Sequence, residues 1–158
     1  MKKVILVSII TLLVLFICLI LYTNDMQMNE FLELRVPWLT RREITGLKDN
    51  DIFTEEEVIK IYLSKIQAKN MIKKIEKNEN WKKGEIDETL KGILELHTRQ
   101  KIFYEIPEIK NSYWTFVNRN GGATDSHSVE ELLNYYHAVS FGVFDLDNNI
   151  LYYYRYCG

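Results

Sequence analysis

Cysteine is scarce in this chain of 158 residues. There are two, Cys18 and Cys157. Cys18 lies inside a long apolar run, so Cys157 is the only cysteine in the remainder of the chain. No intramolecular disulfide can form there, and a structural zinc site built from several cysteines is excluded. We therefore expect a fold that depends on no disulfide, no metal and no cofactor.

An excess of positive charge is also lacking. The chain carries 20 basic and 22 acidic residues, a formal net charge of −2. Lys2 and Lys3 precede the apolar run, which leaves 18 basic against 22 acidic residues and a formal charge of about −4 after it. Binding to a phosphate backbone requires a clustered basic face. The composition therefore argues against a nucleic-acid partner.

Residues 4–22 form the apolar run. They include no charged residue, proline or glycine, and only Ser8 and Thr11 are clearly polar. A helix over this range is roughly 28 Å long at about 1.5 Å per residue, close to the thickness of a bilayer core. No small-x-small cleavage site follows the run. The run thus predicts a retained transmembrane signal anchor, with the membrane as a partner of residues 4–22.

Charges around the run indicate its orientation. Lys2 and Lys3 stand before it, whereas 23–40 contain Arg35 as the single basic residue against three acidic ones. The positive-inside bias places the amino terminus in the cytoplasm and the rest outside the cell membrane. We divide the chain into an anchor over 1–22, a juxtamembrane linker over 23–50 and an extracytoplasmic domain over 51–158.

Two interpretations of the linker remain open. Leu32, Leu34 and Val36 alternate with charged residues, which is typical of a short, half-buried strand that ends before Pro37. The same residues are also compatible with a continuation of the apolar helix to about Arg35.

The first half of the domain has helical signals. Thr54 and Glu57 have the spacing of a capping box, and we expect a helix over 54–77. A second helix is expected over 85–100, where apolar residues recur at helical spacing. Because the connection between them is short, the two long helices should lie antiparallel.

The second half has alternating apolar residues. The pattern predicts strands over 101–106, 112–119, 139–146 and 150–156. A short third helix over 128–137 begins with a second capping box. Helices followed by mostly antiparallel strands indicate an α+β fold, with a sheet of three to five strands.

Three patterns invite a chemical interpretation, and we reject each. Asn120-Gly121-Gly122 lacks the lysine and the spacing of a phosphate loop. Asp145, Asp147 and Asn149 match the start of a calcium loop, but Ile150 stands where that loop needs glycine, so a hairpin turn is preferred. Metal ligands do not converge in the sequence. We assign no catalytic and no metal-binding residue.

Tyrosine is abundant, with 10 residues, and six of them cluster near the end of the chain. Tyrosine is enriched at protein interfaces because it buries a large area and retains a polar tip. If the last strand is an edge strand, its rings require a cover. We predict a partner-binding surface made of Tyr135, Tyr136, Tyr152, Tyr153, Tyr154 and Tyr156.

These observations favour a membrane-anchored, extracytoplasmic protein-binding module over an enzyme. Within that class, an immunity-type or inhibitor protein and an accessory subunit of an envelope complex are two options. The alternative is a small cell-envelope hydrolase that uses His127, Asp125 or Cys157. An enzyme would bring such side chains together in a concave pocket, whereas a binding module would expose an aromatic patch.

Overall fold

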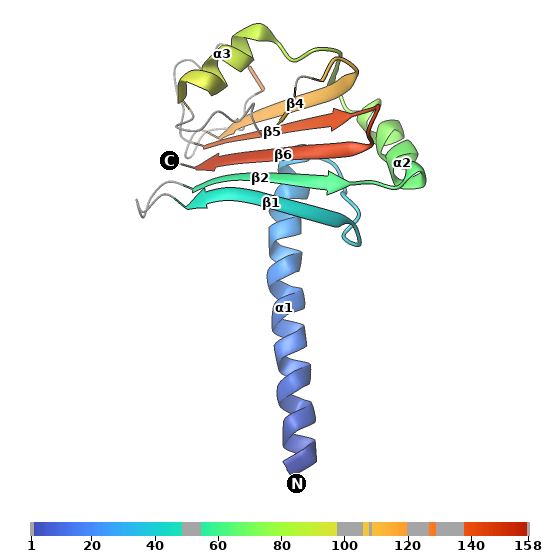
Figure 1. Cartoon of the computed structure of the whole chain (residues 1–158), viewed down its shortest axis with the longest axis vertical. Helices are drawn as coiled ribbons and strands as arrows, with labels where there is room; N and C mark the ends of the chain where they lie inside the picture. The colour runs from blue at the N-terminus through green and yellow to red at the C-terminus, as the bar shows by residue number, and fades with distance from the viewer. Residues whose placement is uncertain are drawn as a thin grey trace.

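The fold is built on one antiparallel sheet, shown in Figure 1. The computed structural model describes residues 2–48, 55–97, 106–107, 109–119, 127–128 and 138–157. Its six strands have the order β1-β2-β6-β5-β4-β3. Their bounds are Arg41–Lys48 (β1), Glu55–Tyr62 (β2), Lys82–Lys83 (β3), Ser112–Arg119 (β4), Ala138–Asp145 (β5) and Ile150–Cys157 (β6). Three helices accompany them: α1 (Lys2–Leu32), α2 (Lys65–Ile75) and α3 (Glu88–His97).

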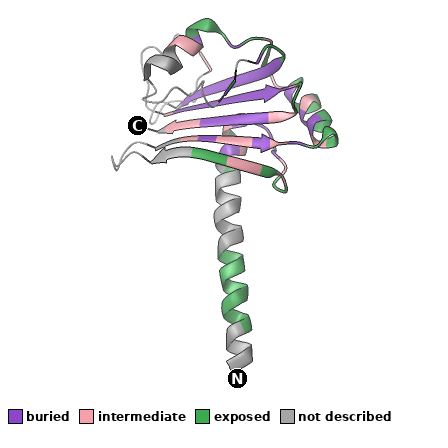
Figure 2. Cartoon of the chain, viewed as in Figure 1, coloured by how far each residue is buried: buried purple, intermediate pink, exposed green. Residues whose placement is uncertain are grey.

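Each face of the sheet carries its own core, because alternate side chains of a strand point to opposite faces. One face packs against Leu90 of α3, and we call this the α3-side core. The other packs against Met28 and Leu32 of α1 and against α2, and we call this the α1-side core. Figure 2 shows β5 buried along nearly its whole length and β6 buried at its centre. The centre of the sheet is therefore buried on both faces.

α1 reaches the sheet closely at one point. A Cβ atom added at Gly142 of β5 would collide with the side chain of Leu32 and would lie 3.2 Å from Cη2 of Trp81. The Trp81 indole also donates a hydrogen bond to the Leu32 carbonyl oxygen, at 2.9 Å. Glycine at position 142 thus makes room for the end of α1.

The predicted helix over 54–77 is wrong in its first half. Residues 55–62 form β2, with Val58 in the α3-side core and Ile61 in the α1-side core. The helix that follows, α2, begins after Ser64, whose side chain accepts a hydrogen bond from the Gln67 amide in a true capping box. The segment expected to be one helix is therefore a strand followed by a shorter helix. The proposed cap, Thr54, lies outside the described residues.

The predicted fold class is wrong as well. α2 has 11 residues and α3 has 10, so the expected pair of long antiparallel helices does not occur in the described chain. The sheet has six strands instead of three to five. The described chain is mostly an antiparallel sheet with short helices on its faces. β-branched residues in β2, taken for helical ones, account for much of the difference.

The transmembrane anchor is a further correction. No helix in the described part of the chain is long and apolar enough to cross a membrane. The prediction of a single-pass membrane protein with a signal anchor over 4–22 is therefore not supported. The prediction treated the run as separate from the domain, whereas α1 continues to Leu32 and its last turn lies in the α1-side core. The location outside the cytoplasm stays a prediction.

Some of the remaining predictions of helices and strands are confirmed, and others fall outside the described residues. The strands predicted over 112–119, 139–146 and 150–156 correspond to β4, β5 and β6 within one residue at each end. The helical continuation of the linker is observed as far as Leu32. The expected strand over 101–106 and helix over 128–137 lie almost wholly outside the described residues.

Candidate functional site

β1 is the outermost strand at one end of the sheet. It pairs with β2 along its whole length, and no strand among the described residues lies on its other side. Ile44, at its middle, is 63% exposed. Trp38 and Leu39, just before the strand, are 67% and 77% exposed. These residues form what we call the open edge: Trp38, Leu39 and β1.

The chain is held firmly just before the open edge. Glu33 and Leu34 donate backbone hydrogen bonds to the carbonyl oxygens of Glu30 and Asn29, at 3.2 and 3.1 Å, which is the Schellman pattern of a helix end. Leu34 and Val36 are buried in the α1-side core. Two residues beyond Val36, the apolar side chains turn outward. Trp38 and Leu39 are therefore exposed although the chain just before them is fixed by hydrogen bonds and by burial of Leu34 and Val36.

One face of the open edge is polar. The Tyr62 hydroxyl donates a hydrogen bond of 2.7 Å to Glu43, and Arg41 pairs with the same carboxylate. The Arg41 guanidinium also lies 4.8 Å from the centre of the Tyr62 ring. The hydrogen bond from Tyr62 lowers the pKa of Glu43, and it raises the pKa of Tyr62. The carboxylate is thus ionised and neutralised locally by Arg41.

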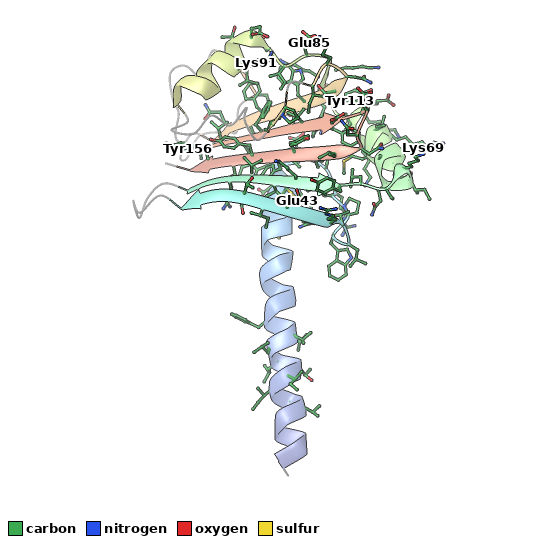
Figure 3. The ribbon with its side chains drawn as sticks, viewed as in Figure 1. Glu43, Lys69, Glu85, Lys91, Tyr113 and Tyr156 are labelled. Atoms are coloured by element: carbon green, nitrogen blue, oxygen red, sulfur yellow. The ribbon has the colours of Figure 1, made fainter. Side chains whose placement is uncertain are left out.

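The opposite end of the sheet is finished differently, and we call it the closed edge: β3 with the outer side of β4. Lys82 and Lys83 of β3 lie over the rings of Trp114 and Tyr113, at 4.9 and 5.7 Å. The Trp114 indole donates to the Glu85 carbonyl oxygen, and the Ser112 hydroxyl donates to that of Gly84. Glu43 and Tyr113 mark the two ends of the sheet in Figure 3.

His127 extends the closed edge. Its Nδ1 lies 2.6 Å from the carbonyl oxygen of Phe116 in β4. Since a carbonyl only accepts, Nδ1 carries the proton. Its Nε2 lies 3.8 Å from Oε1 of Glu33. The other carboxylate oxygen, Oε2, accepts hydrogen bonds from the side-chain amides of Asn78 and Asn80, at 3.1 and 2.9 Å.

Glu33 occupies a strained position in this arrangement. Its φ is +50°, in the left-handed region where the position after a helix usually carries glycine. Its carboxylate bridges the end of α1, the turn after α2 and His127. Chemically, a carboxylate near an imidazole can hold and pass a proton. The two amide donors on this carboxylate favour a structural role, in which Glu33 holds the end of α1 against the turn after α2.

The part of the predicted tyrosine surface that the structure describes is mostly interior. β6 lies between β2 and β5 and pairs with both, so it is not an edge strand. Tyr152, Tyr153 and Tyr154 are buried, and Tyr156 is half-buried. Burial raises the pKa of Tyr152, with the nearby Asp145 adding to the rise. Buried rings cannot contact a partner, so we do not carry these tyrosines into the proposed site. Tyr135 and Tyr136 lie outside the described residues.

The remaining predicted residues are not brought together in the described structure. Asp125 lies outside the described residues, and Cys157 is placed by its backbone alone, opposite Ala138 and Glu55. Asp145 accepts hydrogen bonds from the backbone amides of Asp147 and Asn148, as the preferred hairpin turn requires. Among the described residues, no three His, Cys, Asp or Glu side chains are grouped to hold a metal ion.

Sequence reasoning missed the open edge and Glu33. A clear signal marks neither. β1 reads RREITGLK, in which Gly46 and two adjacent arginines obscure the alternation. The residue that follows a helix in the left-handed conformation is usually glycine, and here it is Glu33. The presence of Trp38, Leu39 and Ile44 around the charged residues 41–43 was the available hint.

The chain has no match among protein-family models, curated proteins or solved structures. Functional inference therefore rests on the site itself.

Proposed function

We propose that this protein is a binding module for other proteins and that it captures an extended polypeptide segment at the open edge. The observation that carries the proposal is β1, an eight-residue outermost strand with Ile44 63% exposed at its middle. An edge strand can pair with an incoming strand through backbone hydrogen bonds, while neighbouring side chains add specificity. The closed edge, by contrast, is covered by lysines and by His127.

The proposal keeps the predicted class of protein, a protein-binding module, and replaces the predicted tyrosine surface by the open edge. An immunity-type or inhibitor protein would use such an edge to capture a strand of its target. An accessory subunit of an envelope complex would use it to join the sheet of a neighbour. The hydrolase alternative has less support, since His127 is the only one of its three predicted residues whose side chain the structure describes, and that side chain is bound to Phe116 and faces Glu33.

The test is selection of displayed random linear peptides on the full-length chain, kept in solution with a non-ionic detergent because α1 exposes apolar side chains. Enriched peptides should slow hydrogen exchange of the amides over 41–48. Ile44→Lys, which places a charge on the edge, should weaken their binding at least tenfold.

Ile66→Lys is the matched control, because Ile66 lies on α2 and is 76% exposed. It should leave the affinity unchanged. The proposal is wrong if no peptide is enriched, or if the enriched peptides bind the Ile44→Lys and Ile66→Lys variants equally well.

A further inference from the structure

We infer that the segment captured at the open edge belongs to a different protein and alternates apolar and polar side chains, with the apolar ones on the α1 side of the sheet. This inference rests on the proposed function and specifies the chemistry of the partner. It follows from the difference between the two faces of β1.

The α1-side face of β1 is apolar at its centre. Ile44 stands opposite Ile59 in the β1–β2 register, and Ile59 packs against the α1-side core. Side chains of directly opposite residues on neighbouring strands lie about 4.5–5.5 Å apart. A strand added beyond β1 would therefore place a side chain directly beside Ile44. An apolar side chain there would bury Ile44, which the described chain leaves 63% exposed.

The other face of β1 asks for polar side chains. By register, Arg41, Glu43, Thr45 and Leu47 lie on it, opposite Tyr62, Lys60, Val58 and Glu56, so three of its four positions are polar. Arg41 and Glu43 neutralise one another, so a hydroxyl or amide side chain fits beside them without an added charge. Because successive side chains of a strand alternate between faces, the two requirements together specify an alternating segment.

A second copy of this chain fits these requirements poorly. By register, β1 places Arg42, Ile44, Gly46 and Lys48 on the α1 side, so a second β1 would bring two basic residues and only one apolar residue to that face. Trp38 and Leu39 add exposed apolar side chains just before Thr40, the residue that precedes β1. A partner segment longer than β1 could also contact these two apolar side chains.

Two synthetic peptides of equal composition test the inference. One has valine at four alternate positions with threonine between them, and the other has the four valines followed by the four threonines. Both carry two lysines for solubility and a fluorescent label. We measure their binding to the full-length chain by fluorescence anisotropy, together with hydrogen exchange over 41–48. The alternating peptide should bind at least fivefold more tightly and should slow exchange there.

Variants assign the preference to Ile44. Ile44→Thr should weaken the alternating peptide about tenfold, the effect of losing roughly 1.4 kcal/mol of apolar burial, and should bring its affinity close to that of the block peptide. Ile66→Thr, the control, should change neither affinity.

Each other outcome has a defined meaning. Equal binding of both peptides, with slowed exchange over 41–48, overturns the alternation and leaves the proposed function standing. Absence of any slowing by either peptide at millimolar concentration overturns the inference, while peptide selection decides the proposed function separately. Exchange over 41–48 that slows with protein concentration alone would show that a second copy covers the edge, and would overturn the assignment to a different protein.

Discussion

At one end of the sheet, β1 runs for eight residues beside β2 and exposes Ile44, whereas at the other β3 covers only two residues of β4. The short edge is completed by lysines stacked on aromatic rings and by a histidine on a backbone carbonyl. Natural sheets commonly protect their edges with short strands and lysine. One chain thus shows both treatments, and the unprotected edge is the better candidate for function.

The largest expected effect comes from the interior strand that separates the two edges. Tyr154 of β6 is fully buried in the α3-side core. Tyr154→Ala should lower the free energy of unfolding by about 3–5 kcal/mol, as for other large aromatic truncations. Denaturant unfolding monitored by hydrogen exchange at both edges measures it. Loss of protection at one edge alone would contradict the expectation that the six-stranded sheet unfolds as one unit.

The closed edge can be weakened at Glu33. Glu33→Ala removes the carboxylate and keeps the left-handed strain, whereas Glu33→Gly removes the carboxylate and relieves the strain. The glycine variant should be more stable than the alanine variant by about 1 kcal/mol. Thermal or chemical unfolding of the two variants gives the difference directly. Equal stabilities would mean that the backbone relaxes out of the left-handed region.

Removing the lysines of the closed edge and adding a lysine to the open edge tests the difference between the two edges. The double variant Lys82→Thr/Lys83→Thr should lose about 1 kcal/mol or less of stability, because both cation–π contacts are at the surface. Its onset of aggregation on heating should fall, since a second edge becomes available for pairing. Ile44→Lys should raise that onset. Light scattering during a thermal ramp measures both, and opposite shifts would refute the assignment of open and closed edges.

The smallest effect concerns alkaline pH. The hydrogen bond to Glu43 raises the pKa of Tyr62 near the open edge, and burial with a hydrogen bond to Glu76 raises the pKa of Tyr113 near the closed edge. A raised folded pKa means that each tyrosine stabilises the fold below its ordinary pKa of about 10. That contribution is lost as the pH rises through the folded value. Tyr62→Phe and Tyr113→Phe should each flatten the decline in stability above about pH 10. Unfolding measured between neutral and strongly alkaline pH tests this.

Local patterns predicted part of this fold well. β4, β5 and β6 were located because apolar residues alternate within them and because Asp147, Asn148 and Asn149 suit a turn. β2 was missed because three glutamates resemble the first turn of a helix, whereas the real capping box lies later, at Ser64 and Gln67. Burial of β6 could not be read locally, since it depends on pairing with β2, far away in the chain. The candidate site was missed for the same reason: an edge is defined by which strands are neighbours.

The pairing of β2 with β6 has a kinetic consequence. Tyr62 pairs with Ile150 and Glu55 pairs with Cys157, so the chain between them must close a very long loop. β4 and β5 and the β5–β6 hairpin have shorter separations and can form earlier. Proteins dominated by such distant contacts fold in milliseconds to seconds, because loop closure comes before the contacts that reward it. We expect the β1–β2 hairpin to dock last, so the strand that offers the binding edge would become available only when folding is complete.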